Sequence, residues 1–229
     1  MVHTVFQRIA ATAFGLIALT GAAAAQNYDG QGIVKFGAFS AGTWMDGTTD
    51  SALRPGGEMA GGGFGVSGGY DLIFGERLLL GAEADVSVGD ISGGASPIKQ
   101  QYLATLRGRL GVFITPQFLI YGTGGVAWTG LEVQKSVAAA ALSTTRVDTA
   151  ETVAGTALGG GLEYDLGTRW GIIVFGEYLR TTSEWSNVPG LGFKFEGEAD
   201  VVRVGLKFKV GHDHRWGRWY EPAGHESLK

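Results

Sequence analysis

Two stretches of the chain decide its fold: LLGAEADVSV at residues 79–88 and TLRGRLGVF at residues 105–113. Two acidic residues alternate with apolar residues in the first stretch, and two arginines alternate with leucine and glycine in the second. A period of two residues is typical of extended strands, whose side chains point alternately to opposite faces. The charged face points to water in a soluble sheet, but it points into the lumen of a membrane-spanning barrel. The rest of the sequence must decide which face is inside.

Eight segments of the chain show a strand-like pattern, and no linker divides them into two domains. The segments are Ile33–Met45, Gly61–Tyr70, Leu78–Val88, Gln101–Phe113, Phe118–Leu131, Thr152–Tyr164, Trp170–Trp185 and Glu198–Val210. Most of them span about 10–14 residues, whereas strands of ordinary globular proteins average about 5–6 residues. A tilted strand needs about 9–11 residues to cross a membrane. Strand length therefore favours a membrane barrel.

Short and long connections alternate along the chain. The short ones are Asp71–Arg77, Ile114–Gln117 and Asp165–Arg169, and the long ones are residues 46–59, 89–100, 132–151 and 186–197. Short periplasmic turns opposite long outer loops are typical of outer-membrane barrels. We therefore predict an all-β fold, a closed eight-stranded antiparallel up-and-down transmembrane barrel.

The charged residues of the strands indicate that the lumen is polar. An Arg or Lys that faces lipid at the bilayer midplane costs about 2–4 kcal/mol, and four such residues would approach the ~5–15 kcal/mol stability of a domain. The predicted barrel-interior charge network consists of Lys35, Glu83, Asp85, Arg107, Arg109, Glu163, Glu177, Arg203 and Lys207. Its acids and bases nearly balance, as charges buried in one narrow space must. The segment Phe118–Leu131 does not decide which of its faces points inward.

The two ends of the chain differ from the predicted barrel, which spans residues 26–210. Residues 1–25 are expected to be a signal peptide, with an apolar core at Ile9–Leu19 and small residues before Gln26. That core is too short to span a bilayer, which needs about 20 apolar residues. Residues 211–229 are expected to form a periplasmic tail.

Composition excludes several classes of protein. The 40 glycines suggest bends and close strand contacts rather than disorder, because 45% of the residues are hydrophobic. The chain contains no cysteine, so no disulfide stabilises it. Its net charge of −4 argues against a nucleic-acid partner.

Four stretches together resemble a known family. They are YLATLRGRLGVF (102–113), FLIYGTGGVAWTG (118–130), GGGLEYDLGTRWGIIVFGEYLRT (159–181) and VVRVGLKF (201–208). The chain resembles the outer-membrane β-barrel family, and more closely the porin-like, opacity-type surface proteins of Gram-negative, especially alphaproteobacterial, bacteria. The resemblance covers about residues 30–210 and implies an eight-stranded barrel of the OmpA type. It implies export to the cell outer membrane and a role in membrane integrity or at the cell surface.

The resemblance also raises a question about the end of the barrel. Such barrels commonly stop at a terminal aromatic residue that the outer-membrane assembly machinery reads. Phe208 occupies that position here, yet 21 residues follow it. Phe208 is therefore a candidate for an internal assembly signal.

The sequence offers little catalytic chemistry. His212 and His214 form an H-x-H pair that is a weak candidate for binding zinc or copper, but a solvated tail explains them better. No histidine lies between Gln26 and Gly211, which argues against hydrolases that use a histidine base. Glu83 and Asp85 could imitate a glycosidase pair, but an ion-pair network explains them better. We expect no enzyme activity and no cofactor.

We therefore predict an integral outer-membrane barrel with a structural or surface role and a lumen largely filled by charges. One alternative is a small porin that passes ions or small solutes. A second is a soluble periplasmic ligand-binding barrel, which requires an apolar lumen and a polar exterior. The expected partners are outer-membrane lipids, the assembly machinery, and surface ligands held by loops 46–59, 89–100, 132–151 and 186–197.

Overall fold

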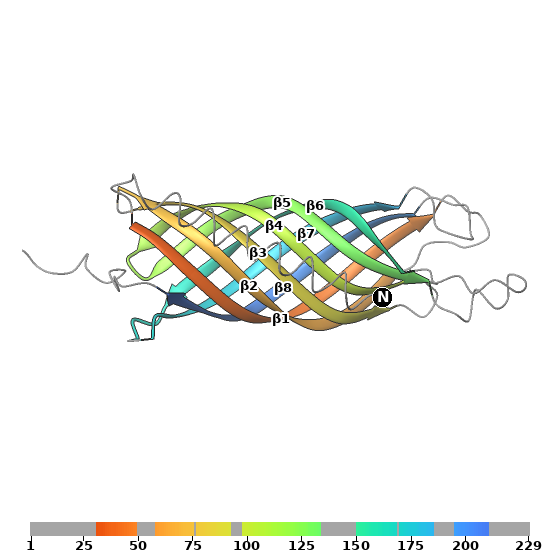
Figure 1. Cartoon of the computed structure of the whole chain (residues 1–229), viewed down its shortest axis with the longest axis horizontal. Helices are drawn as coiled ribbons and strands as arrows, with labels where there is room; N and C mark the ends of the chain where they lie inside the picture. The colour runs from red at the N-terminus through yellow and green to blue at the C-terminus, as the bar shows by residue number, and fades with distance from the viewer. Residues whose placement is uncertain are drawn as a thin grey trace, which may run out of the picture.

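The described residues form a closed barrel of eight antiparallel strands. The computed structural model describes residues 31–49, 58–75, 77–92, 98–133, 150–168, 170–185 and 195–210. The strands are β1 (Gln31–Thr49), β2 (Glu58–Phe74), β3 (Leu78–Ser92), β4 (Ile98–Thr115), β5 (Phe118–Val133), β6 (Ala150–Asp165), β7 (Ile172–Trp185) and β8 (Phe195–Val210). Each strand pairs with its neighbours in the sequence, and β8 closes the barrel against β1 (Figure 1). No helix among the described residues is long and apolar enough to cross a bilayer.

The two ends of the barrel are distinct. We call the end where β2–β3, β4–β5 and β6–β7 connect the turn side, and the opposite end the loop side. On the turn side the connections are short, and Gly75 and Gly167 adopt left-handed backbone angles (φ 50° and 63°) that favour glycine. The loop-side connections lie at residues 50–57, 93–97, 134–149 and 186–194, outside the described residues.

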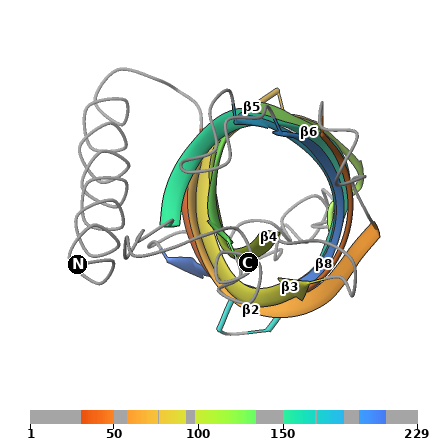
Figure 2. The same cartoon turned by 90° about the vertical axis from the view of Figure 1, so that its right-hand side faces the viewer.

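The register of the strands sets the width of the barrel. Following Cα partners around the sheet leads from Lys35 through Gly69, Glu83, Arg107, Gly125, Ala157, Thr181 and Ala199 to Met45. Met45 lies ten residues beyond Lys35 on the same strand, so the strands are strongly staggered and tilted. An eight-stranded barrel of this kind is just wide enough for side chains to fill. The ring of strands in Figure 2 is therefore filled by side chains, which the ribbons omit.

Apolar side chains cover the outside of the barrel, and charged side chains lie inside. Leu80, Leu110 and Val204 on the outer wall are 49%, 57% and 59% exposed. Glu83 and Arg109, on the opposite faces of the same strands, are 2% and 1% exposed. This is the arrangement of a membrane barrel, and it is opposite to that required by the soluble periplasmic alternative.

Aromatic residues border the apolar outer wall at both ends. Trp44 is exposed towards the loop side, and Tyr164, Trp170 and Phe208 are exposed towards the turn side. Aromatic girdles of this kind are typical of the two membrane interfaces. Phe113, although near a strand end, instead points into the lumen and is buried.

The strands are longer than the sequence pattern predicts, and the prediction of loops 46–59, 89–100, 132–151 and 186–197 is partly wrong. The first three ranges contribute residues to the strands on both sides, and the range 186–197 contributes residues to β8 only. The alternating pattern of apolar residues ends earlier than the strands do, because residues beyond the apolar belt do not face lipid. The backbone pairing of the strands continues past that point. Asp71, predicted to begin a turn, lies inside β2, and β7 begins at Ile172 rather than Trp170.

Candidate functional site

Ten charged residues meet in the middle of the lumen. They are Lys35, Asp71, Glu83, Asp85, Arg107, Arg109, Glu163, Glu177, Arg203 and Lys207, and each is at most 6% exposed. We call these five acids and five bases the charge network. Each occupies an inward position of its strand, and the register makes Glu83 the Cα partner of Arg107 and Glu177 that of Arg203.

Glu163 is the centre of the half of the network nearer the turn side. Its carboxylate accepts hydrogen bonds from Arg109 (2.5 Å), Lys35 (2.7 Å) and Lys207 (3.0 Å). Lys35 and Arg109 also form ion pairs with Asp71. These contacts join β6 to β1, β4 and β8, none of which is its sequence neighbour in the sheet.

Arg107 is the centre of the half nearer the loop side. Its guanidinium donates to Asp85 (2.7 Å) and Glu177 (2.8 Å) from two different nitrogens. Arg203 lies 3.0 Å from Asp85 and 3.5 Å from Glu177, so the same two carboxylates serve both arginines. The lumen is therefore bridged from β3 to β7 as well as from β4 to β8.

Glu83 connects the two halves. Its two oxygens lie 3.3 Å from Arg107 Nη2 and 3.1 Å from Arg109 Nη1, and Lys207 donates to it at 2.5 Å. Uncharged groups also join the network, since Thr105 donates to Asp85 (2.5 Å) and Tyr121 donates to Glu177 (3.0 Å). All ten charges thus belong to one connected set.

Aromatic rings pack against three cations of the charge network. The Arg109 guanidinium lies 4.1 Å from the centre of the Tyr121 ring, and that of Arg203 lies 4.8 Å from the centre of Phe39. Lys207 Nζ lies 4.4 Å from the centre of the Phe175 ring. Cation–π contacts of this kind strengthen when they are desolvated, so the rings stabilise cations that have lost their water.

An apolar layer lies on either side of the charge network. The turn-side layer consists of Ile33, Leu79, Phe113, Leu119, Tyr121 and Ile173, with Ile73 packed against it. The loop-side layer consists of Leu103, Ala127, Ala157, Leu179 and Val201, with Ala41 packed against it. Strand β4 passes through all three in order, from Leu103 through Arg107 and Arg109 to Phe113. The lumen is therefore apolar, charged and apolar along its axis.

The three layers contribute differently to stability. Removing an ion from water costs several kcal/mol, and the cost is recovered only when its partners are well placed. The apolar layers keep water from the charges, so each charge depends on its partners in the network. Removing one partner from a buried pair costs about 3–5 kcal/mol, because the other charge stays buried and uncompensated. The network therefore fixes which strands face one another across the lumen.

The structure places all nine of the sequence-predicted interior residues in the charge network and adds Asp71. The alternation of Ser67 and Gly69 along β2 extends to Asp71, and this signal identifies it in retrospect. Tyr121 was also missed, because the inward face of β5 is undecided in the sequence. Its inward position here also fixes the orientation of Ile120 and Val126, which are exposed on the outer wall.

The other predicted residues lie away from this site. Phe208 points outward from β8 and is 44% exposed, and its role as an assembly signal stays a prediction. His212 and His214 lie outside the described residues, as do the predicted signal peptide (1–25) and tail (211–229). Within the part of the chain that the structure describes, no group of three His, Cys, Asp or Glu residues could hold a metal ion.

Comparison with known proteins gives consistent matches. Residues 10–209 match the outer membrane protein β-barrel domain family. The 31 kDa outer-membrane immunogenic protein of Brucella melitensis is 34% identical over 169 residues, which are 66% of this chain and 68% of that protein. The protein of the same description from Brucella suis matches equally.

Two solved structures have a chain that follows a similar path. Neisserial surface protein A is 11% identical, covers 76% of this chain and 97% of its own, and has a TM-score of 0.46. Ail of Yersinia pestis is 11% identical, covers 77% and 98%, and has a TM-score of 0.45.

Proposed function

Since this chain belongs to the outer-membrane β-barrel domain family and lies in the cell outer membrane, we propose that it serves there as a closed structural barrel rather than as a pore. The layered lumen is the observation that carries this proposal. The turn-side layer closes the lumen with residues such as Leu79, Leu119 and Ile173, each 0% exposed. Hydrophobic constrictions resist filling by water, so an ion that reached the charge network would still meet an apolar barrier.

The charge network gives the same indication. A conducting lumen needs charged groups that are free to exchange partners with passing ions. Here Glu163 is held by three cations and Arg107 by three carboxylates. The polar atoms of these two side chains are all used within the protein, which favours a filled scaffold over a small porin.

We assign no catalysis to the barrel. Glu83 and Asp85, the two carboxylates whose spacing could imitate a glycosidase pair, are both buried and ion-paired with arginine. A general acid or base must come within hydrogen-bond reach of its substrate. The apolar layers prevent a substrate from reaching these two carboxylates. The proposed role is mechanical: the barrel spans the membrane and holds its loops at the surface.

The barrel sits among outer-membrane lipids, and its further partners belong to the proposal. Surface ligands would meet the four loop-side connections, and the assembly machinery would read the end of β8 near Phe208. Replacing Phe208 with Ala should lower the amount of folded barrel in the outer membrane, as measured by heat-modifiable mobility on a gel. Val204→Ala, also on the outer wall of β8, is the matched control.

Planar-bilayer recording of the purified full chain tests the closed lumen. We expect no stable unitary current from the unaltered protein, and an increased ion permeability when Leu119→Ala and Ile173→Ala together thin the turn-side layer. Val126→Ala, on the outer wall of β5, is the control and should stay silent. A steady unitary current from the unaltered protein that Arg107→Gln changes would show that the charge network lines a pore.

A further inference from the structure

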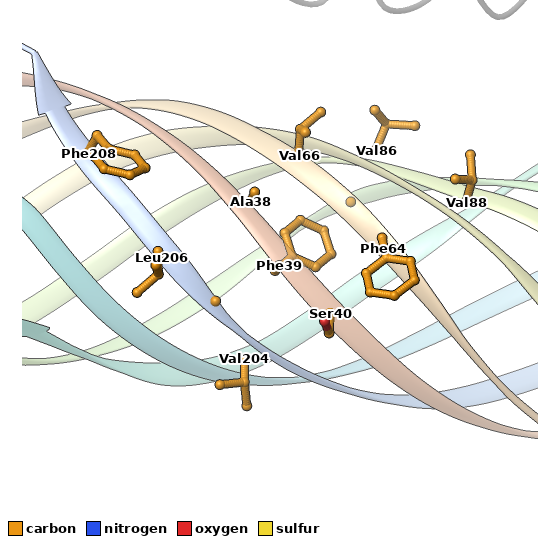
Figure 3. A pocket seen from close by; sticks show the side chains of 12 residues that line it. Ala38, Phe39, Ser40, Phe64, Val66, Val86, Val88, Val204, Leu206 and Phe208 are labelled. Atoms are coloured by element: carbon orange, nitrogen blue, oxygen red, sulfur yellow. The ribbon is translucent and has the colours of Figure 1, made fainter.

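A groove crosses the outer wall of the barrel where β8, β1, β2 and β3 lie side by side (Figure 3). Its volume is about 670 Å³. Its floor and banks are formed by Ala38, Ser40, Phe64, Val66, Val204 and Leu206. We propose that this groove binds one acyl chain of a lipid of the surrounding bilayer, in a preferred position on the barrel.

The register explains why the wall is hollowed here. Ala38 is the Cα partner of Val66 on one side and Leu206 on the other. Ser40 is flanked in the same way by Phe64 and Val204. Two small residues of β1 thus lie between two rows of larger ones, and neighbouring strands are only about 4.8 Å apart. The result is a groove about one strand wide.

The side chains on both sides of the groove project from the outer wall. Phe64 is 72% exposed and Val204 59% exposed, and the small side chain of Ser40, which lies between them, is exposed as well. An unfilled groove would leave these side chains without contacts on one side, and each lost contact forfeits dispersion energy. A flexible hydrocarbon chain can follow the groove and contact its floor and both of its sides.

The groove lies at the level of the bilayer core. Phe39, between the two floor residues, points into the lumen and stacks on Arg203 of the charge network, halfway along the barrel. Phe208 marks the turn-side end of the groove, and Trp44 lies beyond its loop-side end. The groove is thus continuous with the apolar surface that contacts lipid, and its occupant must be hydrocarbon rather than water.

Trp44 is oriented towards the groove. A Cβ atom built on Gly42 would lie 3.3 Å from the Trp44 ring, so the indole leans back over Gly42 towards Ser40. Tryptophan prefers the membrane interface, where one part of the ring is apolar and the other is wet. The indole therefore sits where an acyl chain in the groove would leave the hydrocarbon region.

A second copy of the barrel fits the groove less well. A two-fold interface brings the same surface of both copies together, so concave wall would face concave wall and leave the floor unfilled. The proposal therefore commits to a lipid chain. It depends on the position of the barrel in the membrane and not on whether the lumen conducts.

Photolabelling tests the proposal with the purified full chain in phosphatidylethanolamine vesicles. A small fraction of the lipid carries a diazirine in the middle of one acyl chain, and labelled peptides are located by mass spectrometry. We expect several-fold more label on the outer residues of β1, β2 and β8 than on those of β5. The variant Ala38→Leu with Ser40→Leu fills the floor and should reduce this label to the level of β5.

The controls keep the test decisive. Ala82→Leu makes the same kind of change on the outer wall of β3, outside the groove, and should leave the enrichment intact. Ser40→Leu alone replaces the double variant if the latter does not fold, as judged by heat-modifiable mobility. Even labelling around the barrel, or unchanged enrichment in the filled variant, would overturn the proposal. Cross-linked pairs of groove peptides from two copies would also overturn it, in favour of a dimer.

Discussion

Two regions fill the lumen, the charge network and the turn-side layer. Both are buried, but they have different roles in the structure of the barrel. The charges make directional contacts between strands that are not neighbours, such as Lys35 of β1 with Glu163 of β6. The apolar side chains of the turn-side layer pack without such pairing and exclude water. The charge network selects one arrangement of the strands, whereas the turn-side layer closes the lumen. Substitutions that alter one region at a time separate these two roles.

Glu163→Gln should have the largest effect. It keeps the size of the side chain but leaves Lys35, Arg109 and Lys207 with an excess of positive charge in a dry lumen. We expect a loss of about 3–5 kcal/mol in the free energy of unfolding, measured by urea titration in vesicles. Glu198→Gln, on the exposed face of β8, is the control. Equal unfolding midpoints for the two variants would contradict a structural role for the network.

Leu119→Ala should have the next largest effect, through the other region. It removes a fully buried side chain from the turn-side layer and leaves a cavity. Such substitutions cost about 2–5 kcal/mol, and urea titration would show the loss. Val126→Ala on the outer wall should change the midpoint less. If the charge network alone stabilised the lumen, Leu119→Ala would behave like this control.

Asp71→Asn should have a smaller effect within the network. The amide keeps the shape of the carboxylate but weakens the contacts with Lys35 and Arg109, both of which retain Glu163 as a partner. We expect a loss of about 1–3 kcal/mol, again by urea titration. Asp46→Asn, which is exposed, serves for comparison. A loss as large as that of Glu163→Gln would mean that the two acids are equally central.

Arg180→Ala should have the smallest effect. Arg180 pairs with Asp200 on the outside of the barrel, where the two side chains are 56% and 38% exposed. Exposed ion pairs contribute little because solvent screens them. We expect no measurable change in the unfolding midpoint. A clear loss would show that charges outside the barrel matter as much as those within it.

The sequence predicts the outer wall and the charged interior well, because charges within apolar strands reveal which face is which. It does not reveal the turn-side layer. Leu79 lies in a run of three leucines and Leu119 between Phe118 and Ile120, so both faces of these strand ends are apolar. Only the register shows which of these side chains points inward.

Contacts across the lumen are equally hidden in the sequence. Glu83 and Arg107 are Cα partners on adjacent strands, and such proximity follows from the strand order. Lys35 and Glu163 are 128 residues apart, and their meeting depends on the stagger of all eight strands. Asp71 was hidden for another reason, since an aspartate next to a glycine-containing turn resembles turn chemistry.

The reach of the charge network across the barrel has a consequence for how the chain folds. A hairpin or half-barrel cannot satisfy Glu163, whose partners come from β1, β4 and β8. Partly assembled forms would hold unpaired charges, which favour water and oppose insertion into lipid. Pairing of the first strand with the last completes most of these contacts at once. Assembly should therefore be highly cooperative, with the interior charges delaying insertion until the chain is nearly complete.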